Sequence, residues 1–481
     1  MEETKEILLE EATIDHIQSL FGEGKLSSKE LTMYYLKRIA ELDKNGPHIN
    51  AVIEINPDAL FIAEAMDKER KEGKVRSAWH GIPVLLKDNV NTDDAMHTSA
   101  GSLAMVGNYA AKDAHAAAIL RKSGAVILGK TNLTEWANFM ALHMPNGYSS
   151  RGGQVQNPYG SQFDVSGSSS GSAAAVSANF CMAAVGTETS GSIVCPASSN
   201  SIVGIKPTVG LVSRQGIIPI SSSQDTAGPM ARTVKDAALL LEILAGVDQA
   251  DPATWKQPES IELTSGIETA SLVGLRIGIS EDYFFKPLND SQKKLFERTL
   301  NVLELDGATI VKLREISPLE NEDWDYNVLL HEFKSGINAY LSKNNARLSS
   351  LKEIIEFNNN QAESALLHGQ ELLLASEKTS GTLTEPAYLN ARLNDLNKSQ
   401  NLGIDKSMAE YSLDAIVYPT NVWYGIPAKA GYPSISVPAG FEENGTPFGI
   451  SFCAEAFSEK KLVRIAYAFE QATHHRKAPK L

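Results

Sequence analysis

The chain has 481 residues, of which 43% are hydrophobic and 21% charged, and its formal net charge is −14. This composition is typical of a globular protein, and the negative charge argues against a nucleic-acid partner. No run of about 18 or more apolar residues is present, so no membrane-spanning helix is predicted.

The first 17 residues are acidic and amphipathic and do not resemble a signal peptide. The cysteines Cys181, Cys195 and Cys453 are odd in number and lie in apolar surroundings, as is typical of reduced, buried thiols. We therefore expect a cytoplasmic protein, although a leader removed from the mature chain is also compatible with this sequence.

An N-terminal helical segment with one short strand is predicted for residues 1–75. Ser27 and Glu30 have the spacing of a capping box ahead of a helix. Residues 50–55 are expected to form the strand, and Pro57 to open a second helix. No chemistry is predicted for this segment.

A buried strand is predicted for residues 82–86, which are apolar on both faces. Lys87 stands at its end, where burial would lower the pKa of its ammonium group and allow it to act as a general base. Alternatively, Lys87 reaches solvent or pairs with Asp88. The local sequence alone favours these structural alternatives.

The next segment predicts a second buried strand, at residues 125–129, followed by a turn into a helix. Such alternation indicates a largely parallel sheet covered on both faces. Sites in these sheets gather at the C-terminal ends of strands, where Lys87 and Thr131 would lie. The polar loop at 144–172 is longer than a loop that only connects two elements, so it is expected to belong to the site.

Two clusters of serine, threonine and glycine, at 166–172 and 187–192, flank an apolar, alanine-rich run. Their hydroxyl and backbone N–H groups could supply a nucleophile and an oxyanion hole. A flexible linker is the alternative, but residues 173–185 are too apolar for a solvated tether. We predict a helix at 172–182, a strand at 183–186 and a sharp turn at 187–192.

The remainder of the chain is predicted to complete one α/β domain, with a core at 76–250 and a second part at 251–481. A helical cap is expected near 323–411. The other predicted elements are helices at 232–246, 295–305 and 460–473, strands at 275–279, 308–313 and 415–418, and a hairpin of 434–437 with 448–453.

Two short motifs are weak candidates for other chemistries. Residues 167–171 (GSSSG) match the nucleophile elbow of α/β-hydrolases, but a loop rather than a strand precedes them. Ser349 and Lys352 match S-x-x-K without its partner motifs. Metal-ligand spacing and nucleotide fingerprints are absent from the sequence, so no cofactor and no metal are expected.

Four segments together resemble the amidase signature family: 81–89 (GIPVLLKDN), 166–175, 186–193 (GTETSGSI) and 204–208 (GIKPT). The resemblance extends from about residue 10 to 475. It implies a single large α/β domain whose mixed, mostly parallel central sheet is covered by helices on both faces. Within the family the sequence most resembles bacterial peptide amidases, at residues 129–138, 150–154 and 223–232.

The resemblance implies a Ser–cis-Ser–Lys triad. Its nucleophile falls on Ser192, its bridging serine on Ser168, and its general base on Lys87. The peptide bond before Ser168 is expected to be cis, with Gly167 and Ser169 as a supporting loop. Placing the bridge at Ser168 rather than Ser169 rests on aligning the following residues with the start of the family's helix.

The family's oxyanion hole falls on consecutive backbone N–H groups of Thr189, Ser190, Gly191 and Ser192. Several positions depart from the common family pattern. Serine replaces glycine at Ser166 and Ser170, and Val194 replaces an arginine, which puts charge-assisted support of the loop in doubt. The segment 421–430 is unusually short, so a more open or differently shaped pocket is expected.

The resemblance implies an amide hydrolase that cleaves a carboxamide to acid and ammonia through an acyl-serine intermediate. Peptide C-terminal amides are the expected substrates, and a small-molecule amide is compatible too. The alternative is the glutaminase (A) subunit of a tRNA-dependent amidotransferase, which would need a partner. A third interpretation, an inactive docking protein, is disfavoured because all three triad residues are present. We expect a monomer or homodimer without nucleic-acid or membrane partners.

Overall fold

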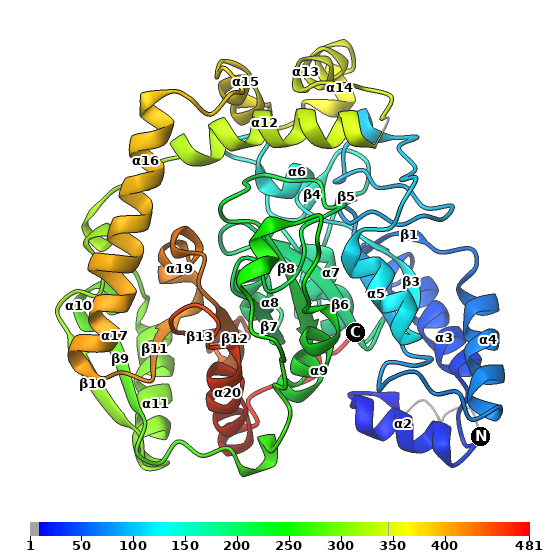
Figure 1. The fold of residues 1–481 in the computed structure, drawn as a ribbon. Coiled ribbons are helices and arrows are strands. Elements are labelled where there is room, and N and C mark those ends of the chain that lie inside the picture. The colour runs from blue at the N-terminus through cyan, green and yellow to red at the C-terminus, as the bar shows by residue number, and fades with distance from the viewer. Residues whose placement is uncertain (1–8, 345) are drawn as a thin grey trace.

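A mixed β-sheet of 11 strands organises the computed structural model, which describes residues 9–344 and 346–481. The strand order across the sheet is β1-β3-β2-β6-β8-β7-β12-β13-β11-β9-β10 (Figure 1). The strands are β1 (Val52–Ile55), β2 (Pro83–Lys87), β3 (Val126–Thr131), β6 (Ala183–Glu188), β7 (Val203–Lys206), β8 (Thr226–Ala231), β9 (Arg276–Ser280), β10 (Thr309–Leu313), β11 (Ala415–Pro419), β12 (Ser434–Phe441) and β13 (Pro447–Cys453).

The parallel share of this sheet is smaller than the sequence predicted. Parallel pairing joins β2 to β3 and β6, and β9 to β10 and β11. The strands between these two groups pair antiparallel. The difference arises because β8 lies between β6 and β7, and because the hairpin β12–β13 occupies the centre.

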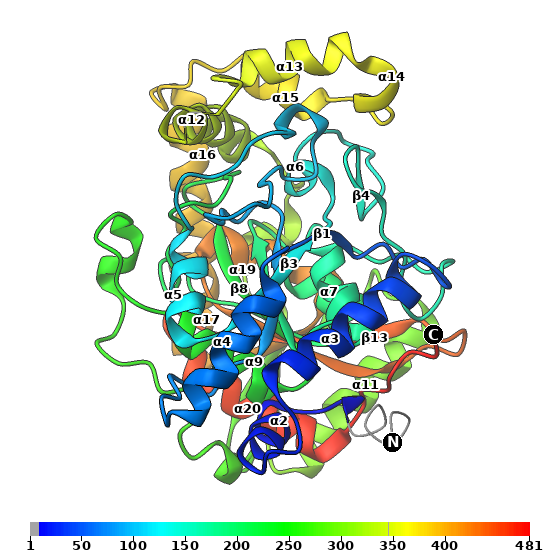
Figure 2. The same ribbon diagram turned by 90° about the vertical axis from the view of Figure 1, so that its right-hand side faces the viewer.

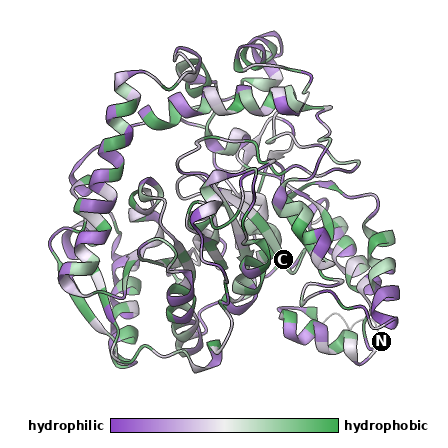
Figure 3. Cartoon of the chain, in the orientation of Figure 1, coloured by the Kyte–Doolittle hydropathy of each residue, from purple (hydrophilic) through white to green (hydrophobic). Residues whose placement is uncertain are grey.

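Helices cover both faces of the sheet. On one face α5, α9, α20 and α11 contact one another in succession, and on the other α7 contacts α8. These surrounding helices carry both hydrophobic and hydrophilic residues (Figure 3), and in α11 the residues Leu295, Phe296, Leu300 and Leu303 form the buried stripe. The bounds of these helices are α5 (His115–Ser123), α7 (Ser170–Ser177), α8 (Val194–Ser199), α9 (Val234–Leu244), α11 (Asp290–Leu305) and α20 (Glu459–Thr473).

A layer of helices from the segment 327–377 lies across one end of the molecule (Figure 2), and the next helix runs from this layer down one side (Figure 1). Its buried side chains join a second hydrophobic cluster with Trp136, Phe139 and Ile218 from the core segment. The layer is therefore packed onto loops at one end of the sheet. Its helices are α12 (Asn327–Lys343), α13 (Leu351–Asn360), α14 (Ala362–Ala365) and α15 (Glu371–Glu377), and the helix along the side is α16 (Pro386–Leu396).

The remaining helices lie at the two ends of the chain and in its connections. The predicted capping box of Ser27 and Glu30 is confirmed at the start of α3. These helices are α2 (Ile14–Gly22), α3 (Ser28–Arg38), α4 (Ala59–Lys71), α6 (Glu135–Asn138), α10 (Glu281–Phe285), α17 (Asp405–Tyr411), α18 (Thr420–Trp423) and α19 (Gly425–Ala430); a two-strand hairpin pairs β4 (Tyr148–Ser149) with β5 (Gly153–Gln154).

Most predicted strands are confirmed within one or two residues, whereas three elements differ. The helix expected at 172–182 is the shorter α7, because the left-handed residue Asn179 ends it. Residues 194–199 form the helix α8, where the sequence analysis assigned no element. The strand β8 was not predicted, since its sequence TAGPMA contains the strand-weakening residues glycine and proline.

Cys181, Cys195 and Cys453 are buried and form no disulfide, which confirms the predicted state of these thiols. Each helix in the two described ranges is too short or too polar to cross a bilayer.

The close packing of α7 predicts the effect of adding one methyl group. A Cβ at Gly171 would lie 2.3 Å from the carbonyl oxygen of Asn132 and 2.4 Å from that of Ala51. Gly171→Ala should therefore destabilise the protein by about 1–3 kcal/mol and lower its melting temperature in calorimetry. The matched control is Gly22→Ala, because nothing lies within 4 Å of a Cβ there. Equal melting temperatures of the two variants would contradict the packing described.

Candidate active site

The candidate site lies at the C-terminal ends of the parallel neighbours β2 and β6. Lys87 is the last residue of β2, and the turn at 189–192 follows β6 directly. The helix α7 contacts both strands, and Ser168 and Ser169 immediately precede it. The three segments that the sequence singled out are therefore brought together.

The amino group of Lys87 is buried and held by three acceptors. Its Nζ lies 2.8 Å from Ser168 Oγ, 3.0 Å from Ser169 Oγ and 3.2 Å from the carbonyl oxygen of Thr187. Burial lowers the pKa of Lys87 to about 7, while the negative charges of Glu188 and Asp225 oppose this shift. A substantial fraction of Lys87 is therefore neutral at neutral pH and able to accept a proton.

The two serines that contact Lys87 differ in their other contacts. Ser169 Oγ donates to the carbonyl oxygen of Thr187 at 3.0 Å and accepts from the Thr187 N–H at 3.2 Å. The Ser169 N–H donates to the carbonyl oxygen of Ser192 at 3.1 Å, which ties the two serine clusters together. Within the described ranges, Ser168 Oγ hydrogen-bonds to Lys87 alone. Ser169 thus fixes the backbone, and Ser168 is the serine free to exchange a proton.

The peptide bond between Gly167 and Ser168 is cis, which confirms the geometry that the family resemblance implied. Gly167 is required here because a Cβ would lie 2.4 Å from Thr134 Oγ1. The G-x-S-x-G motif is not a nucleophile elbow, since no strand precedes it and its central Ser169 is bound to backbone groups.

The buried carboxylate of Glu188 shapes the turn that carries Ser192. Its Oε1 accepts from the Gly191 N–H at 2.7 Å, and its Oε2 accepts from the N–H groups of Ile193 at 2.7 Å and Val194 at 3.0 Å. Gly191 has a φ of +79°, and a Cβ there would lie 2.7 Å from the ring of Tyr424. Support for the loop thus comes from Glu188, a carboxylate that precedes the turn. The arginine expected in the family after the turn is replaced by Val194 and is not needed for this support.

The expected oxyanion donors fall into two groups. Gly191 donates its N–H to Glu188, so in this structure that group holds the turn. In the described part of the chain, the N–H groups of Thr189, Ser190 and Ser192 donate to no protein acceptor. These three remain available to a ligand.

A carboxylate that the sequence analysis did not single out fixes Thr189 from the side. Thr189 Oγ1 donates to Asp225 Oδ1 at 2.5 Å, and Asp225 Oδ2 accepts from the N–H groups of Ile220 at 2.8 Å and Ser221 at 2.9 Å. Burial raises the pKa of Asp225 to about 6. The loop before β8 is thereby coupled to the first residue of the oxyanion turn.

A cavity of about 340 Å³ opens beside Ser192 and Ser190. Its walls are largely aromatic and aliphatic, with Phe139 from the end of α6, Trp324, Tyr326 and Leu329 from the start of the cap, and Tyr424 from the short segment 421–430. Three consecutive residues before Phe139 adopt the left-handed conformation, with φ between 52° and 68°. Strain of this kind is concentrated at functional sites.

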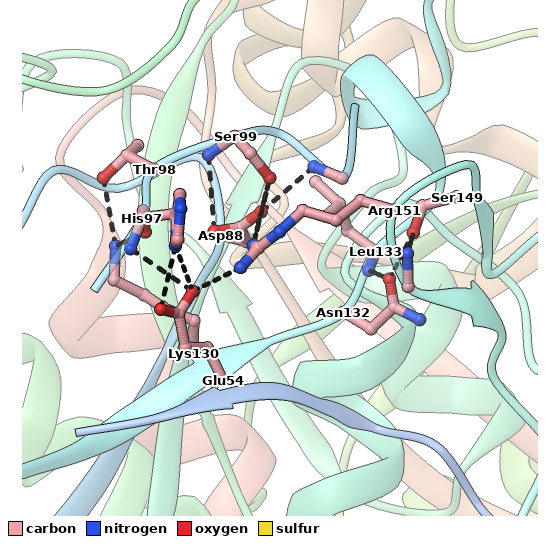
Figure 4. Close-up of polar contacts among 12 residues, drawn as sticks. Glu54, Asp88, His97, Thr98, Ser99, Lys130, Asn132, Leu133, Ser149 and Arg151 are labelled. Carbon is pink, nitrogen blue, oxygen red and sulfur yellow. Dashed lines mark hydrogen bonds and ion pairs between the residues drawn. The ribbon is translucent and has the colours of Figure 1, made fainter. Parts of the chain in front are cut away.

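A polar network supports the strand ends behind the site (Figure 4). Asp88 accepts from Ser99 Oγ and from the Gly101 N–H at 3.1 Å, and it does not pair with Lys87. Lys130 is also buried, and it donates to the carbonyl oxygens of Val90 at 2.7 Å and His97 at 3.1 Å and to Thr98 Oγ1 at 3.1 Å. Lys130 is therefore structural, and the predicted alternative of a Lys87–Asp88 pair is wrong.

Two carboxylates that the sequence analysis did not identify, Glu188 and Asp225, contribute to the site. Glu188 could have been noticed as an acidic residue within a buried strand directly before the glycine turn. Asp225 lies in a segment that resembles the peptide amidases, but nothing local indicated its contact with Thr189. The S-x-x-K pair carries no site: Lys352 is exposed, and Ser349 Oγ donates to Glu353 at 2.9 Å.

A family model, solved structures and related sequences all match this chain to amidases. The family model described as Amidase matches residues 30–423. The crystal structure of native peptide amidase from Stenotrophomonas maltophilia superposes with a TM-score of 0.93 at 45% identity, covering 98% of each chain. A probable amidase from Arabidopsis thaliana is 42% identical over 98% of this chain and 92% of its own length. A glutamyl-tRNA(Gln) amidotransferase subunit from Pseudomonas syringae is 34% identical over 98% of this chain and 99% of its own length.

The chain belongs to the amidase family, and its fold and sequence make it an amide hydrolase of the amidase signature type.

The contacts of Glu188 predict that its charge and shape are both needed. Glu188→Gln replaces one acceptor oxygen by an NH2 group and leaves buried N–H groups of the turn unpaired, at a cost of about 1–3 kcal/mol. We expect a lower melting temperature and a kcat for amide hydrolysis reduced about ten- to hundredfold.

Glu459→Gln is the matched control, because this buried carboxylate binds the Thr208 N–H at 2.6 Å far along the chain from the turn. It should lower stability with little change in kcat. A wild-type kcat in Glu188→Gln would contradict the role assigned to Glu188.

Proposed function

We propose that the protein hydrolyses a carboxamide to a carboxylic acid and ammonia through an acyl-enzyme on Ser192, with Ser168 and Lys87 as proton carriers. The observation that carries the proposal is the 2.8 Å hydrogen bond between Lys87 and Ser168, made by a buried lysine whose pKa is about 7. A serine hydroxyl is a weak nucleophile and needs such a base.

Acylation begins when Ser192 Oγ attacks the amide carbonyl carbon. Its proton passes to Ser168 Oγ as the proton of Ser168 passes to the neutral amine of Lys87. A hydroxyl group can accept one proton while it donates another, which suits Ser168 for this bridge. Ser169 keeps the bridge in place through its bonds to Thr187 and Ser192.

The tetrahedral intermediate carries negative charge on the former carbonyl oxygen. The free N–H groups of Thr189 and Ser190, with that of Ser192, are the proposed oxyanion donors, and Gly191 contributes by holding the turn. Collapse breaks the C–N bond, and the nitrogen takes a proton from Ser168, which is restored from the Lys87 ammonium. Water then attacks the acyl-serine by the reverse sequence of proton transfers.

Peptide C-terminal amides are the proposed substrate class. The aromatic cavity beside Ser192 suits an apolar residue on the acyl side, and its rim carries the half-exposed rings of Trp324 and Tyr326. Ser190 Oγ is buried and has no hydrogen-bond partner in the described part of the chain, so it is available to a peptide group. The similar Stenotrophomonas protein is a peptide amidase, which favours the same class. The unbridged thiols fit a cytoplasmic location.

The second candidate is the glutaminase subunit of a tRNA-dependent amidotransferase, favoured by the 34% identity, along both chains, to the Pseudomonas protein. Ammonia release from glutamine that increases with tRNA and a partner subunit would support it. Release from peptide amides by the isolated chain would support the first candidate.

Alanine substitutions separate the roles of the three serines. Ser192→Ala should reduce kcat/KM for a peptide amide at least about 10³-fold, because the nucleophile is lost. Ser168→Ala should cost about 10²–10⁴-fold through loss of the proton bridge, and Ser169→Ala about tenfold through lost positioning. Released ammonia is the measured product. Near-wild-type hydrolysis by Ser192→Ala would refute the proposed function.

The pKa of Lys87 predicts the acid limb of the pH profile. Only neutral Lys87 accepts the proton, so kcat/KM should rise about tenfold per pH unit below pH 7 and level off above it. The negative charge of Asp225 raises the pKa of Lys87, so Asp225→Asn should move this limb to lower pH. A limb that moves to higher pH in this variant would contradict the assignment of Lys87 as the base.

A further inference from the structure

A buried carboxylate on the cap contacts the loop that carries Asp225. Glu332 lies in α12, and its side chain is 2% exposed. Its Oε2 accepts from Ser221 Oγ at 2.5 Å, and from the N–H and Oγ of Ser223 at 2.9 Å and 3.0 Å. Its Oε1 accepts from the hydroxyl of Tyr388, in α16, at 2.8 Å. One side chain thus joins two helices of the cap to the loop before β8.

The loop at 217–225 also packs closely on α12 through apolar contacts. A Cβ at Gly336 of this helix would lie only 3.1 Å from Pro219 Cγ in the loop. Ile220 of the loop and Leu329 of the helix belong to the same hydrophobic cluster. Both side chains also line the cavity of about 340 Å³ in the candidate site. The loop is therefore held on the helix by apolar packing as well as by the carboxylate.

Ser221 connects the carboxylate of Glu332 with that of Asp225. Its hydroxyl donates to Glu332, and its N–H donates to Asp225 Oδ2 at 2.9 Å. The other oxygen of Asp225 accepts from Thr189 Oγ1 at 2.5 Å. A continuous chain of hydrogen bonds thus leads from α12 to the first residue of the oxyanion turn.

Gln224 provides a second link, which acts on the backbone of the turn. Its side chain is 1% exposed, and its Nε2 donates to the carbonyl oxygen of Thr189 at 3.1 Å. The peptide bond between Thr189 and Ser190 is trans, and in a trans peptide unit the C=O and N–H groups point in opposite directions. Gln224 therefore also sets the direction of the Ser190 N–H, one of the proposed oxyanion donors.

We propose that Glu332 is a positioning residue for amide hydrolysis, and that docking of the loop on α12 through its carboxylate sets the oxyanion donors of the turn. Among the described residues, Glu332 is not a wall of the cavity beside Ser192, so it acts on the reaction through the loop. The helix that borders the acyl group through Leu329 is then also the helix that holds the turn. This inference rests on the proposed function.

Glu332→Met tests the proposal, because methionine has a similar length and no acceptor oxygen. With N-acetyl-phenylalanine amide as substrate, we expect kcat to fall about ten- to hundredfold with little change in KM. Glu332→Gln keeps one acceptor oxygen and should recover part of the loss. The acid limb of the pH profile should not move, because the charges that act on Lys87 are those of Glu188 and Asp225.

A transition-state analogue separates positioning from a general loss of structure. The aldehyde N-acetyl-phenylalaninal adds to Ser192 Oγ and forms a hemiacetal, whose oxygen occupies the oxyanion site. The alcohol N-acetyl-phenylalaninol has the same side chain and no carbonyl group. In Glu332→Met the inhibition constant of the aldehyde should rise about as much as kcat falls, while that of the alcohol stays the same.

A double-mutant cycle tests whether Glu332 acts through the loop. Gln224→Met removes the donor to the Thr189 carbonyl oxygen and should by itself lower kcat. If Glu332 and Gln224 act in series, the loss of kcat in the double variant should be at least about threefold smaller than the product of the two single losses. Independent effects would multiply.

Glu242→Met is the matched control. One oxygen of Glu242, on α9, also accepts from three donors, the N–H groups of Leu263 and Thr264 and the hydroxyl of Thr264. The control should lower the melting temperature and leave kcat and the aldehyde inhibition constant unchanged. Ser221→Ala removes one donor to Glu332 and carries the test if Glu332→Met fails to fold. It should show the same pattern with a loss of kcat of about three- to tenfold.

The outcomes separate this inference from the proposed function. If the wild-type protein hydrolyses no carboxamide, the proposed function itself fails and the positioning role falls with it. If the wild type is active, a wild-type kcat in the folded Glu332→Met or Ser221→Ala variant would overturn the role of Glu332 alone. An unchanged aldehyde inhibition constant, or losses of kcat that multiply in the cycle, would overturn it as well.

Discussion

The burial of one amino group is the constraint on which the site depends. Lys87 has a pKa of about 7 because water is excluded from it. Keeping it there costs roughly 4 kcal/mol of stability at neutral pH, since the unfolded chain binds the proton more tightly. This cost falls as the pH rises from about 7 to 10.5, where the unfolded lysine also loses its proton. The sheet supplies the surroundings that tolerate it: two parallel neighbours of β2, the tightly packed α7 and three acceptors in reach of Nζ.

Two carboxylates set the balance around this lysine. Glu188 and Asp225 each bind backbone or hydroxyl donors of the turn and its neighbouring loop, and each raises the pKa of Lys87 against the effect of burial. Glu188 occupies the N–H groups of Gly191, Ile193 and Val194, and within residues 9–344 and 346–481 the N–H groups of Thr189, Ser190 and Ser192 have no acceptor. The two carboxylates that shape the turn and its neighbouring loop therefore also raise the pKa of Lys87.

The sequence predicted those features that depend on local pattern or on long family motifs. β2 and β3 were predictable because their residues are apolar on both faces, and the contact of Lys87 with Ser168 agrees with the motifs around these residues. Whether Lys87 is buried and neutral could not be read locally, because its partners Ser168 and Thr187 lie about 80 and 100 residues further on. β8 was missed because glycine and proline mask a buried strand. Of the cavity walls, the sequence analysis connected only the segment 421–430, which supplies Tyr424, with the pocket. Phe139 and Trp324 were missed because they lie far from Ser192 in the sequence and approach it only in the folded chain.

The central claim is that Ser192, activated through Ser168 by neutral Lys87, carries the acyl group. The most direct measurement is to quench the enzyme during turnover of a slow amide or activated ester substrate and to locate the added acyl mass by peptide mass spectrometry. The account predicts the adduct on the peptide that contains Ser192 and its loss in Ser192→Ala. An adduct on Ser168 or Ser169, or turnover without any acylated serine, would contradict it.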